Sequence, residues 1–308
     1  KYHILMRLLD FNAHFPDEAS CKKHFKHYRD KEGIVCSNCK GLAHNWLSKK
    51  WMYECKNCRF RTSLKKGTIM ENSKLKFRTW YQILLFISAT KKGFSASEVQ
   101  RQIGKKRYEP VWNALHKIRQ AMGQRDDRYL LNDMVEFDDA FFEVATKESP
   151  QTKRGRGSQR QSKVAVSAES TILEDLETGK IERSCRYFKM KIAEGFQAEK
   201  TDEIITAMIN QNSVVTTDCS TSYVNISNIV EIHQTHRSSK EITNTSLKWT
   251  HVAISNAKRN FLGVYHKIKA KYLQNYLNEF VYKLNRRYFK ERLFDRVIIA
   301  MASSKWAI

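Results

Sequence analysis

Two Cys-x-x-Cys motifs constrain the fold of this chain more than any other feature of its sequence. Fifteen residues separate the pair Cys36 and Cys39 from the pair Cys55 and Cys58. Two such knuckles bring four thiolates together tetrahedrally, as in a closed structural zinc site. A redox motif is the alternative, but two motifs at this spacing favour Zn²⁺. Because four thiolates leave no open coordination position, we expect the metal to fold the segment and present its basic residues, without a catalytic role.

The net charge favours a polyanionic partner. The 308 residues include 55 Lys and Arg against 32 Asp and Glu, which gives a formal net charge of +23, and nucleic acid is the partner that suits such an excess. A membrane surface is the competing partner, but the sequence has no run of eighteen apolar residues and no signal-peptide pattern. Seven cysteines in such a chain predict a reducing compartment, here the bacterial cytoplasm with association to the nucleoid.

The composition divides the chain into four predicted segments. We expect a helical lead-in at residues 1–33, a zinc ribbon at 34–70, a helix-turn-helix at 75–125 and an α/β domain at 132–308. A hydrophobic content of 41% is enough to build buried cores in these segments.

Three apolar stripes at helical spacing follow the cysteine segment, and Gly93 and Gly104 separate them. A capping box from Ser95 to Glu98 begins the second helix. The third helix, at about 108–122, is expected to contact DNA bases in a helix-turn-helix. A small helical bundle would give much of the same pattern.

Basic side chains in three places are expected to contact DNA. They lie beside the second cysteine pair, in and after the Gly104 turn, and in a Gly- and Ser-rich loop at residues 150–161. These cations would supply the salt-sensitive affinity for phosphates. The residues are Arg59, Lys105, Lys106, Arg107, Lys117, Arg119, Lys153, Arg154, Arg156 and Arg160.

A short acidic strand begins the α/β domain. Residues 135–142 alternate apolar and acidic side chains, which places Glu136 and Asp138 on one face and Asp139 on the other. Carboxylates in an apolar strand need a metal ion or a Lys or Arg to offset their desolvation. An edge strand with a solvated acidic face is the alternative interpretation.

The segments after the acidic strand predict an α/β pattern that brings a second carboxylate to the same place. A β-branched strand at 213–218 ends on Asp218, and side chains at the carboxyl end of a strand commonly face a site. Asp218 is therefore expected to meet Asp138. Residues 220–250 are polar, and their two histidines, His233 and His236, are interpreted as structural or DNA-facing. Strands are also predicted at 163–168 and 186–192, and helices at 199–211 and 272–287.

The two aspartates predict a site for a divalent metal. Mg²⁺ and Mn²⁺ prefer carboxylate oxygens, and a metal pair in phosphodiester chemistry activates the attacking oxygen and stabilises the leaving oxygen. Glu136 or Asp139 is an alternative to Asp138 as a ligand.

A third ligand is needed beside the two aspartates, and the sequence leaves two possibilities. Asn256 offers a neutral carbonyl oxygen at a plausible helix start, and Lys258 is placed to steady a phosphate. His251 is the alternative ligand. Asn256 would otherwise act as a helix N-cap.

The order of these motifs resembles the zinc-ribbon insertion-sequence transposases of the Merlin-related DDE group, which have an ISXO2-like catalytic domain. After the ribbon and the helices, the resemblance rests on Val135–Asp139, Thr216–Asp218 and Ile254–His266. The segment Tyr272–Arg287 is similar to the closing helix of that family. The resemblance covers residues 10–300 and implies a catalytic domain with a ribonuclease-H-like mixed sheet.

The resemblance also implies metal ligands. Asp138 and Asp218 match the first and second aspartates of the family, and Asn256 matches a third position that is Glu or Asn, with Lys258 as the nearby lysine. The chain departs from the family at Asp139, and the missing third carboxylate should weaken metal binding. Phe142-Glu143 is a further departure, because a pair of glycines is usual there.

These observations together predict a DNA transposase. It would bind the terminal inverted repeats of its element as double-stranded DNA, and cleave and transfer strands with Mg²⁺ or Mn²⁺ as the catalytic cofactor and Zn²⁺ as the structural one. Joining two ends implies a homodimer or a higher oligomer, with no membrane partner. The alternatives are a domesticated or inactive transposase acting as a DNA-binding regulator, and a metal-dependent nuclease of the same fold.

Overall fold

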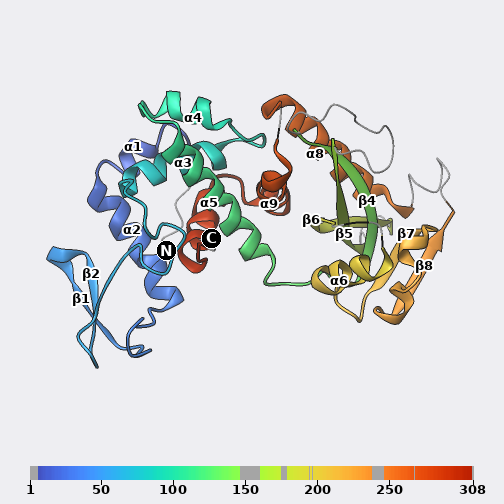
Figure 1. The fold of residues 1–308 in the computed structure, drawn as a ribbon, viewed down its shortest axis with the longest axis horizontal. Coiled ribbons are helices and arrows are strands. Elements are labelled where there is room, and N and C mark those ends of the chain that lie inside the picture. Colours follow the sequence, from blue (N-terminus) through green and yellow to red (C-terminus); the bar gives the residue numbers. More distant parts are fainter. Residues whose placement is uncertain are drawn as a thin grey trace. The chain divides into compact units, whose positions relative to one another are not determined.

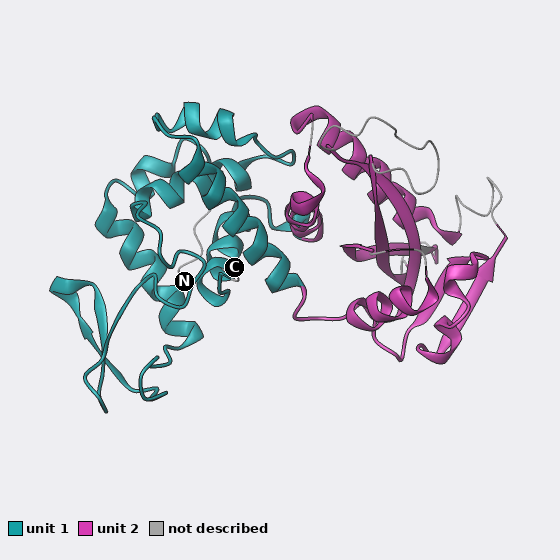
Figure 2. Cartoon of the chain, viewed as in Figure 1, with its two compact units in different colours: residues 1–126, 286–308 teal, residues 127–285 magenta. Residues whose placement is uncertain are grey.

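A computed structural model of the chain describes residues 6–145, 160–174, 179–193, 195, 197–237, 246–266 and 268–306. The chain forms two compact units (Figure 2). Unit 1 comprises residues 1–126 and 286–308, and unit 2 comprises residues 127–285.

Unit 1 begins with two helices and a small sheet (Figure 1). The Asp17 carboxylate accepts a hydrogen bond of 2.7 Å from the backbone N–H of Ser20, which caps the second helix at its N-terminus. The three strands pair antiparallel in the order β1-β2-β3 and follow the first cysteine pair. These elements are α1 (Phe11–His14), α2 (Glu18–Glu32), β1 (His44–Leu47), η1 (Ser48–Lys50), β2 (Met52–Cys55) and β3 (Arg61–Ser63).

The three helices predicted after the ribbon are present. They are α3 (Phe77–Ala89), α4 (Ala96–Gln102) and α5 (Glu109–Asp126). The Ser95 hydroxyl accepts a hydrogen bond of 3.1 Å from the backbone N–H of Glu98, as the capping box predicts. Gly104, with φ of 64°, makes the turn between α4 and α5 in a left-handed conformation that favours glycine.

The C-terminal segment departs from the predicted domain boundaries. We assigned residues 286–308 to the α/β domain, but they belong to unit 1. After η4 (Arg287–Arg292), helix α10 (Leu293–Ser303) packs against α2, α3 and α5. The reason is its broad apolar surface, which unit 1 buries; the buried apolar residues are Leu293, Phe294, Val297, Ile298, Ala300, Met301 and Ala302.

Unit 2 is built on a five-stranded mixed sheet in the order β6-β5-β4-β7-β8. Strand β4 pairs antiparallel with β5, and β5 antiparallel with β6, whereas β4, β7 and β8 are parallel neighbours. The predicted fold class, an α/β domain with a ribonuclease-H-like mixed sheet, is confirmed. The strands are β4 (Met134–Glu143), β5 (Gln161–Glu174), β6 (Ile181–Ile192), β7 (Val214–Asp218) and β8 (Ile232–His236).

Helices cover both faces of this sheet. Residues of α8 (Lys248–Val264) and α9 (Ala270–Asn285) form one core with Ala140 and Phe142 of β4. Residues of α6 (Ala198–Met208), η2 (Thr221–Tyr223) and η3 (Ile226–Asn228) form the other core with Val135 and Phe137. The alternation along β4 therefore directs Glu136 and Asp138 to the α8 face and Asp139 to the α6 face.

Two parts of the sheet differ from the prediction. Strands β5 and β6 are longer than expected and form a hairpin with a register shift between Glu169 and Ser170. Strand β8 lies in the stretch 220–250, which we interpreted only as polar. It is a five-residue strand at the sheet edge, where side chains need not be apolar.

Among the described residues, no helix has the length and apolar character needed to cross a membrane.

Candidate functional site

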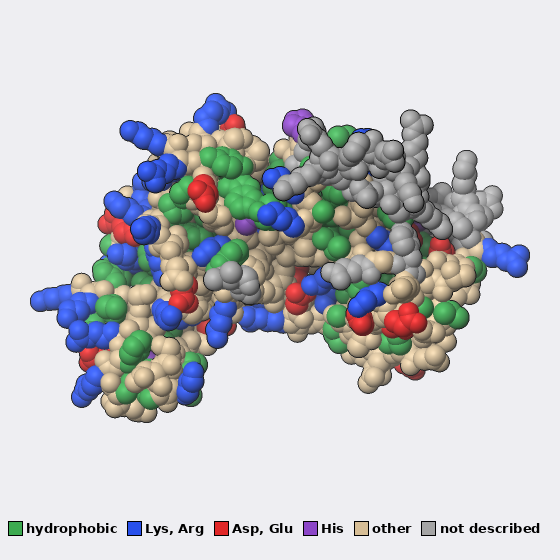
Figure 3. All heavy atoms as spheres, in the orientation of Figure 1, with side chains coloured by type: hydrophobic (Ala, Val, Ile, Leu, Met, Phe, Trp, Pro, Cys, Tyr) green, Lys and Arg blue, Asp and Glu red, His purple; other side chains and the backbone are tan. Residues whose placement is uncertain are grey.

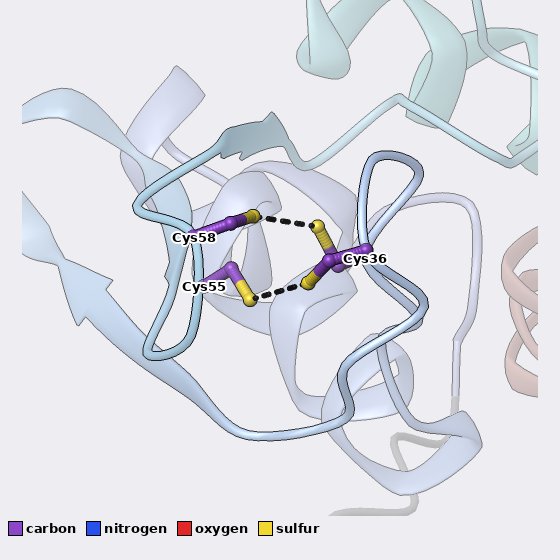
Figure 4. A group of neighbouring side chains, drawn as sticks. Cys36, Cys55 and Cys58 are labelled. Carbon is purple, nitrogen blue, oxygen red and sulfur yellow. Dashed lines mark hydrogen bonds between the residues drawn. The ribbon is translucent and has the colours of Figure 1, made fainter.

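The four cysteines of the two Cys-x-x-Cys motifs converge as the sequence predicted. Their sulfur atoms all lie within 4.8 Å of one another. Cys36 Sγ lies 3.6 Å from Cys58 Sγ, and Cys39 Sγ lies 3.5 Å from Cys55 Sγ (Figure 4). A tetrahedral site with Zn–S bonds of about 2.3 Å has S···S edges of about 3.8 Å, so the cluster fits a zinc ion. No other group of three or more His, Cys, Asp or Glu ligand atoms converges this closely in the described part of the chain.

The two knuckles share one backbone geometry. In each knuckle, the residue after the second cysteine, Lys40 or Arg59, donates its backbone N–H to the carbonyl oxygen of the first cysteine at 3.0 Å. Both residues adopt the left-handed conformation, with φ of 60° and 62°. Hydrogen bonds from the Asn38 side chain and the Phe60 backbone lower the pKa of Cys58 to about 6. The second knuckle therefore favours the thiolate form of Cys58, which is the form that binds metal.

Gly41 lies against the sulfur cluster. A Cβ atom at this position would lie 2.9 Å from Asn57 Nδ2 and 3.3 Å from the sulfur atoms of Cys39 and Cys55. Glycine is thus the residue that lets the backbone approach the sulfur atoms of Cys39 and Cys55 this closely.

In unit 2, the parallel pairing of β4 and β7 places Asp138 and Asp218 in matching positions. The paired register ends at Glu136 and Thr216, and each aspartate lies two residues further along its strand. Both side chains therefore emerge on the same face and at the same level of the sheet. The Asp218 carboxylate also accepts a hydrogen bond of 3.0 Å from the backbone N–H of Ser220, which orients it.

The pKa of Asp138 reflects its burial among other carboxylates. Its side chain is only 14% exposed. Burial, together with the negative charges of Asp139, Asp218 and Glu136, raises the pKa of Asp138 to about 7. A cation bound between the carboxylates would remove this penalty, so the donor set fits a hard divalent metal.

His251, in the first turns of α8, lies beside Asp138. Its Nε2 atom is 3.4 Å from Asp138 Oδ2. Burial lowers the pKa of His251, which favours the neutral imidazole, the form that can bind a metal.

Asn256 lies elsewhere on α8. Five residues separate it from His251, which is about 140° around the helix axis. Its Oδ1 atom accepts a hydrogen bond of 2.8 Å from Arg259 Nη2. Lys258 is seven residues from His251 and so shares its side of the helix, where its Nζ lies 5.7 Å from the centre of the Phe142 ring.

Glu136 and Asp139, the acidic residues of β4 nearest to Asp138, contact protein groups. Glu136 is fully buried, and its Oε2 atom accepts hydrogen bonds from the backbone N–H groups of Trp249 (2.7 Å) and Thr250 (3.0 Å) at the start of α8. Asp139 Oδ1 accepts a hydrogen bond of 2.6 Å from the Tyr223 hydroxyl. No sequence pattern indicated Tyr223, because this contact joins residues 84 positions apart.

The residues that we expected to contact DNA are exposed, at least half-buried, or outside the described residues. Arg59 has a side chain that is 72% exposed, and Lys105, Lys106 and Arg107 are exposed in the turn between α4 and α5. Figure 3 shows Lys and Arg side chains gathered on this face of unit 1, with few Asp and Glu side chains among them. Arg160 is also exposed, on unit 2. Lys153, Arg154 and Arg156 lie outside the described residues.

Arg119 requires a correction. It is 1% exposed, so its guanidinium cannot reach DNA from this position. Helix α5 packs against α3, α4 and α10, so more of its surface is buried than the single apolar stripe that the sequence predicted. Lys117 is half-buried and donates a 3.0 Å hydrogen bond to the Glu71 carbonyl oxygen.

Comparison with known proteins identifies unit 2. A sequence model of the ISXO2-like transposase domain matches residues 130–285. No curated protein matches the chain.

Solved structures of Mos1 complexes show only loose similarity. A pre-cleavage Mos1 transpososome is 10% identical, with a TM-score of 0.28 over 69% of this chain and 75% of that chain. The Mos1 strand transfer complex is 12% identical, with a TM-score of 0.31 over 68% and 70%. Similarity at this level does not define a shared fold.

The family match spans the whole sheet of unit 2, from β4 to the end of α9. It covers half of the chain and includes Asp138, Asp218 and the helix that carries His251 and Asn256. The resemblance inferred from the motifs is confirmed, and the chain belongs to the ISXO2-like transposase domain family.

Proposed function

We propose that the protein is a DNA transposase that binds the terminal inverted repeats of its element and performs metal-dependent strand cleavage and strand transfer. The observation that carries this proposal is the matched position of Asp138 and Asp218 on parallel strands. A pair of carboxylates at the carboxyl ends of adjacent parallel strands is suited to hold Mg²⁺ or Mn²⁺.

The residues of the site have separate roles in this proposal. Asp138 and Asp218 bind the divalent metal, and the neutral imidazole of His251 is the third ligand. We prefer His251 to Asn256 because it approaches Asp138 and because Arg259 occupies the amide oxygen of Asn256. When bound, the metal activates the attacking water or 3′-hydroxyl and stabilises the leaving oxygen. Lys258, on the same side of α8 as His251, contacts a phosphate of the substrate strand.

Unit 1 supplies the DNA-binding function in this proposal. The zinc ribbon presents Arg59, and the turn between α4 and α5 presents Lys105, Lys106 and Arg107. These exposed cations contact phosphates, which makes binding dependent on salt. Because two transposon ends must be joined, the active species is at least a dimer.

A cleavage assay tests the proposal. The zinc-loaded chain is incubated with DNA that carries the ends of its element, in Mn²⁺ or Mg²⁺, beside the variants Asp138→Asn and Asp218→Asn. We expect the native chain to cut and join strands, and both variants to bind DNA but not cut. Asp127→Asn is the matched control, since Asp127 is an exposed carboxylate paired with Lys191 outside the site. If the native chain binds DNA but does not cut it in either metal, a DNA-binding regulator is favoured. If it cuts strands but does not join them, a nuclease is favoured.

The same assay separates the two candidate third ligands. His251→Ala should reduce cleavage by at least a hundredfold, whereas Asn256→Ala should retain most of it. The reverse order of effects would restore Asn256 as the third ligand.

A further inference from the structure

The start of helix α8 lacks a capping group of its own. The residue before the helix, Leu247, has no side chain that can accept a hydrogen bond, and the first turn contains no acidic residue. Its first residue, Lys248, places a positive charge at the helix end where a negative charge is favourable. The first N–H groups of α8 therefore need acceptors from elsewhere in the protein.

Glu136 supplies this acceptor from β4. Its Oε2 atom accepts hydrogen bonds from the backbone N–H groups of both Trp249 and Thr250, and the side chain is fully buried. The Thr250 hydroxyl donates to the Leu247 carbonyl oxygen at 2.8 Å, which closes the same turn. A carboxylate at this position satisfies two N–H groups and carries the charge that the helix dipole favours.

The other oxygen of Glu136 faces Arg183. Arg183 Nη1 lies 3.8 Å from Glu136 Oε1, and Arg183 Nε donates to the Ser170 hydroxyl at 2.5 Å. The Ser170 hydroxyl in turn donates to the backbone carbonyl of Met134 at 3.3 Å. The Glu136 carboxylate is thus held between β6 and α8: Oε2 accepts both helix N–H groups, and Oε1 has the Arg183 guanidinium as an ion-pair partner but accepts no hydrogen bond from the described residues.

The same helix carries His251, directly after the two residues that Glu136 holds. Glu136 also lies two residues before Asp138 on β4, on the same face. Glu136 therefore holds the start of α8 immediately before His251, the residue of α8 that lies against Asp138.

We propose that Glu136 is a positioning residue, which caps α8 from β4 and thereby sets His251 against Asp138. This inference rests on the proposed function, because it concerns the geometry of the same metal site. Groups that orient metal ligands commonly change metal affinity by about 10- to 100-fold when they are removed.

Mn²⁺ binding to the zinc-loaded full chain, followed by electron paramagnetic resonance, tests the proposal. We expect Glu136→Ala to weaken Mn²⁺ binding about tenfold or more at unchanged stoichiometry. Glu136→Gln should stay within about threefold of the native chain, because its amide oxygen still accepts both N–H groups. Hydrogen exchange at the amides of Trp249 and Thr250 should accelerate in Glu136→Ala.

Glu169 provides a matched control. It is also a buried carboxylate of the same sheet, accepts a backbone N–H (from Asn132 at 2.9 Å) and faces an arginine (Arg186 at 3.6 Å). Glu169→Ala should lose stability but keep the Mn²⁺ affinity of the native chain and the slow exchange at the start of α8.

Three results would overturn the inference. Native Mn²⁺ affinity and slow amide exchange in Glu136→Ala would show that the cap has no positioning effect. Loss of a bound ion in both Glu136 variants would make Glu136 a ligand. Equal Mn²⁺ binding by the native chain and Asp138→Asn would overturn the proposed function as well. Should Glu136→Ala not fold, Glu136→Met, which fills the same space without an acceptor, replaces it in both measurements with Glu169→Met as its control.

Discussion

Three carboxylates of β4 have different contacts although they lie within four residues. Asp138 lies beside His251 and is affected by the negative charge of Asp218, Glu136 holds α8, and Asp139 holds Tyr223 on the opposite face. Because side chains alternate along a strand, the sequence predicted that Asp139 lies on the opposite face of the sheet from Glu136 and Asp138. It did not separate Glu136 from Asp138, because their difference arises from contacts with a helix more than a hundred residues away.

The start of α8 was the least predictable part of the site for a related reason. We took Asn256 to lie near a helix start, but α8 begins at Lys248. The sequence carries no local capping signal there, because the cap comes from Glu136. Without it, the helix start was placed too late and His251 was not assigned to the first turns.

Metal binding should depend on pH through Asp138. Since burial and its neighbouring carboxylates raise the pKa of Asp138 to about 7, a proton competes with the metal below that pH. We expect Mn²⁺ affinity to fall about tenfold from pH 8 to pH 6, measured by calorimetry on the zinc-loaded chain. Asp138→Asn should bind weakly with little dependence on pH in this range. Equal Mn²⁺ affinity of the native chain at pH 8 and pH 6 would contradict the assignment of Asp138 as a metal ligand.

Tyr223→Phe should destabilise unit 2 by about 1–3 kcal/mol, because it removes one hydrogen bond from the part-buried Asp139 carboxylate. The remaining partner of Asp139 is Lys163, at 3.3 Å. Urea unfolding measures the change, and Tyr288→Phe is the control, since Tyr288 is 73% exposed. A change as small as that of the control would mean that the Tyr223 hydroxyl contributes nothing to stability.

Helices and strands with strong local signals were predicted best. The ribbon cysteines, α3, α4 and α5 were all placed from spacing, caps and glycines. Strand β8 was missed because an edge strand with polar residues lacks the apolar alternation that identifies a strand.

The ribbon depends on close approach of the chain at Gly41. Gly41→Ala should weaken zinc binding, measured by competition with a chelator, because the new Cβ lies 2.9 Å from Asn57 Nδ2 and 3.3 Å from two sulfur atoms. Gly263→Ala is the control: a Cβ there meets nothing within 4 Å, and alanine in α8 should stabilise the helix by up to about 1 kcal/mol. Unchanged zinc affinity in Gly41→Ala would show that the cluster tolerates a displaced backbone.

The two units of the chain are not consecutive in sequence. The sequence indicated the boundary near residues 125–132, but not the return of the chain to unit 1 after residue 285. An apolar C-terminal helix carries no information about which of two cores it joins, so its assignment required the structure.

Removal of residues 286–308 should therefore unfold part of unit 1 and spare unit 2. Without α10, the buried residues of α5, including Arg119, lose one of their packing partners. Hydrogen exchange should accelerate in α5 and remain slow in β4 and β5. Slow exchange in α5 after the truncation would show that unit 1 is stable without its C-terminal helix.

Asp138, Asp218 and His251 are proposed to form one metal site. Anomalous diffraction from crystals of the zinc-loaded chain soaked in Mn²⁺ would locate the bound ion. We predict a manganese peak between the carboxylates of Asp138 and Asp218 and beside His251, and no such peak in Asp138→Asn. A manganese peak at Asn256 would contradict this assignment. So would the absence of a peak at the aspartates at an Mn²⁺ concentration that supports cleavage.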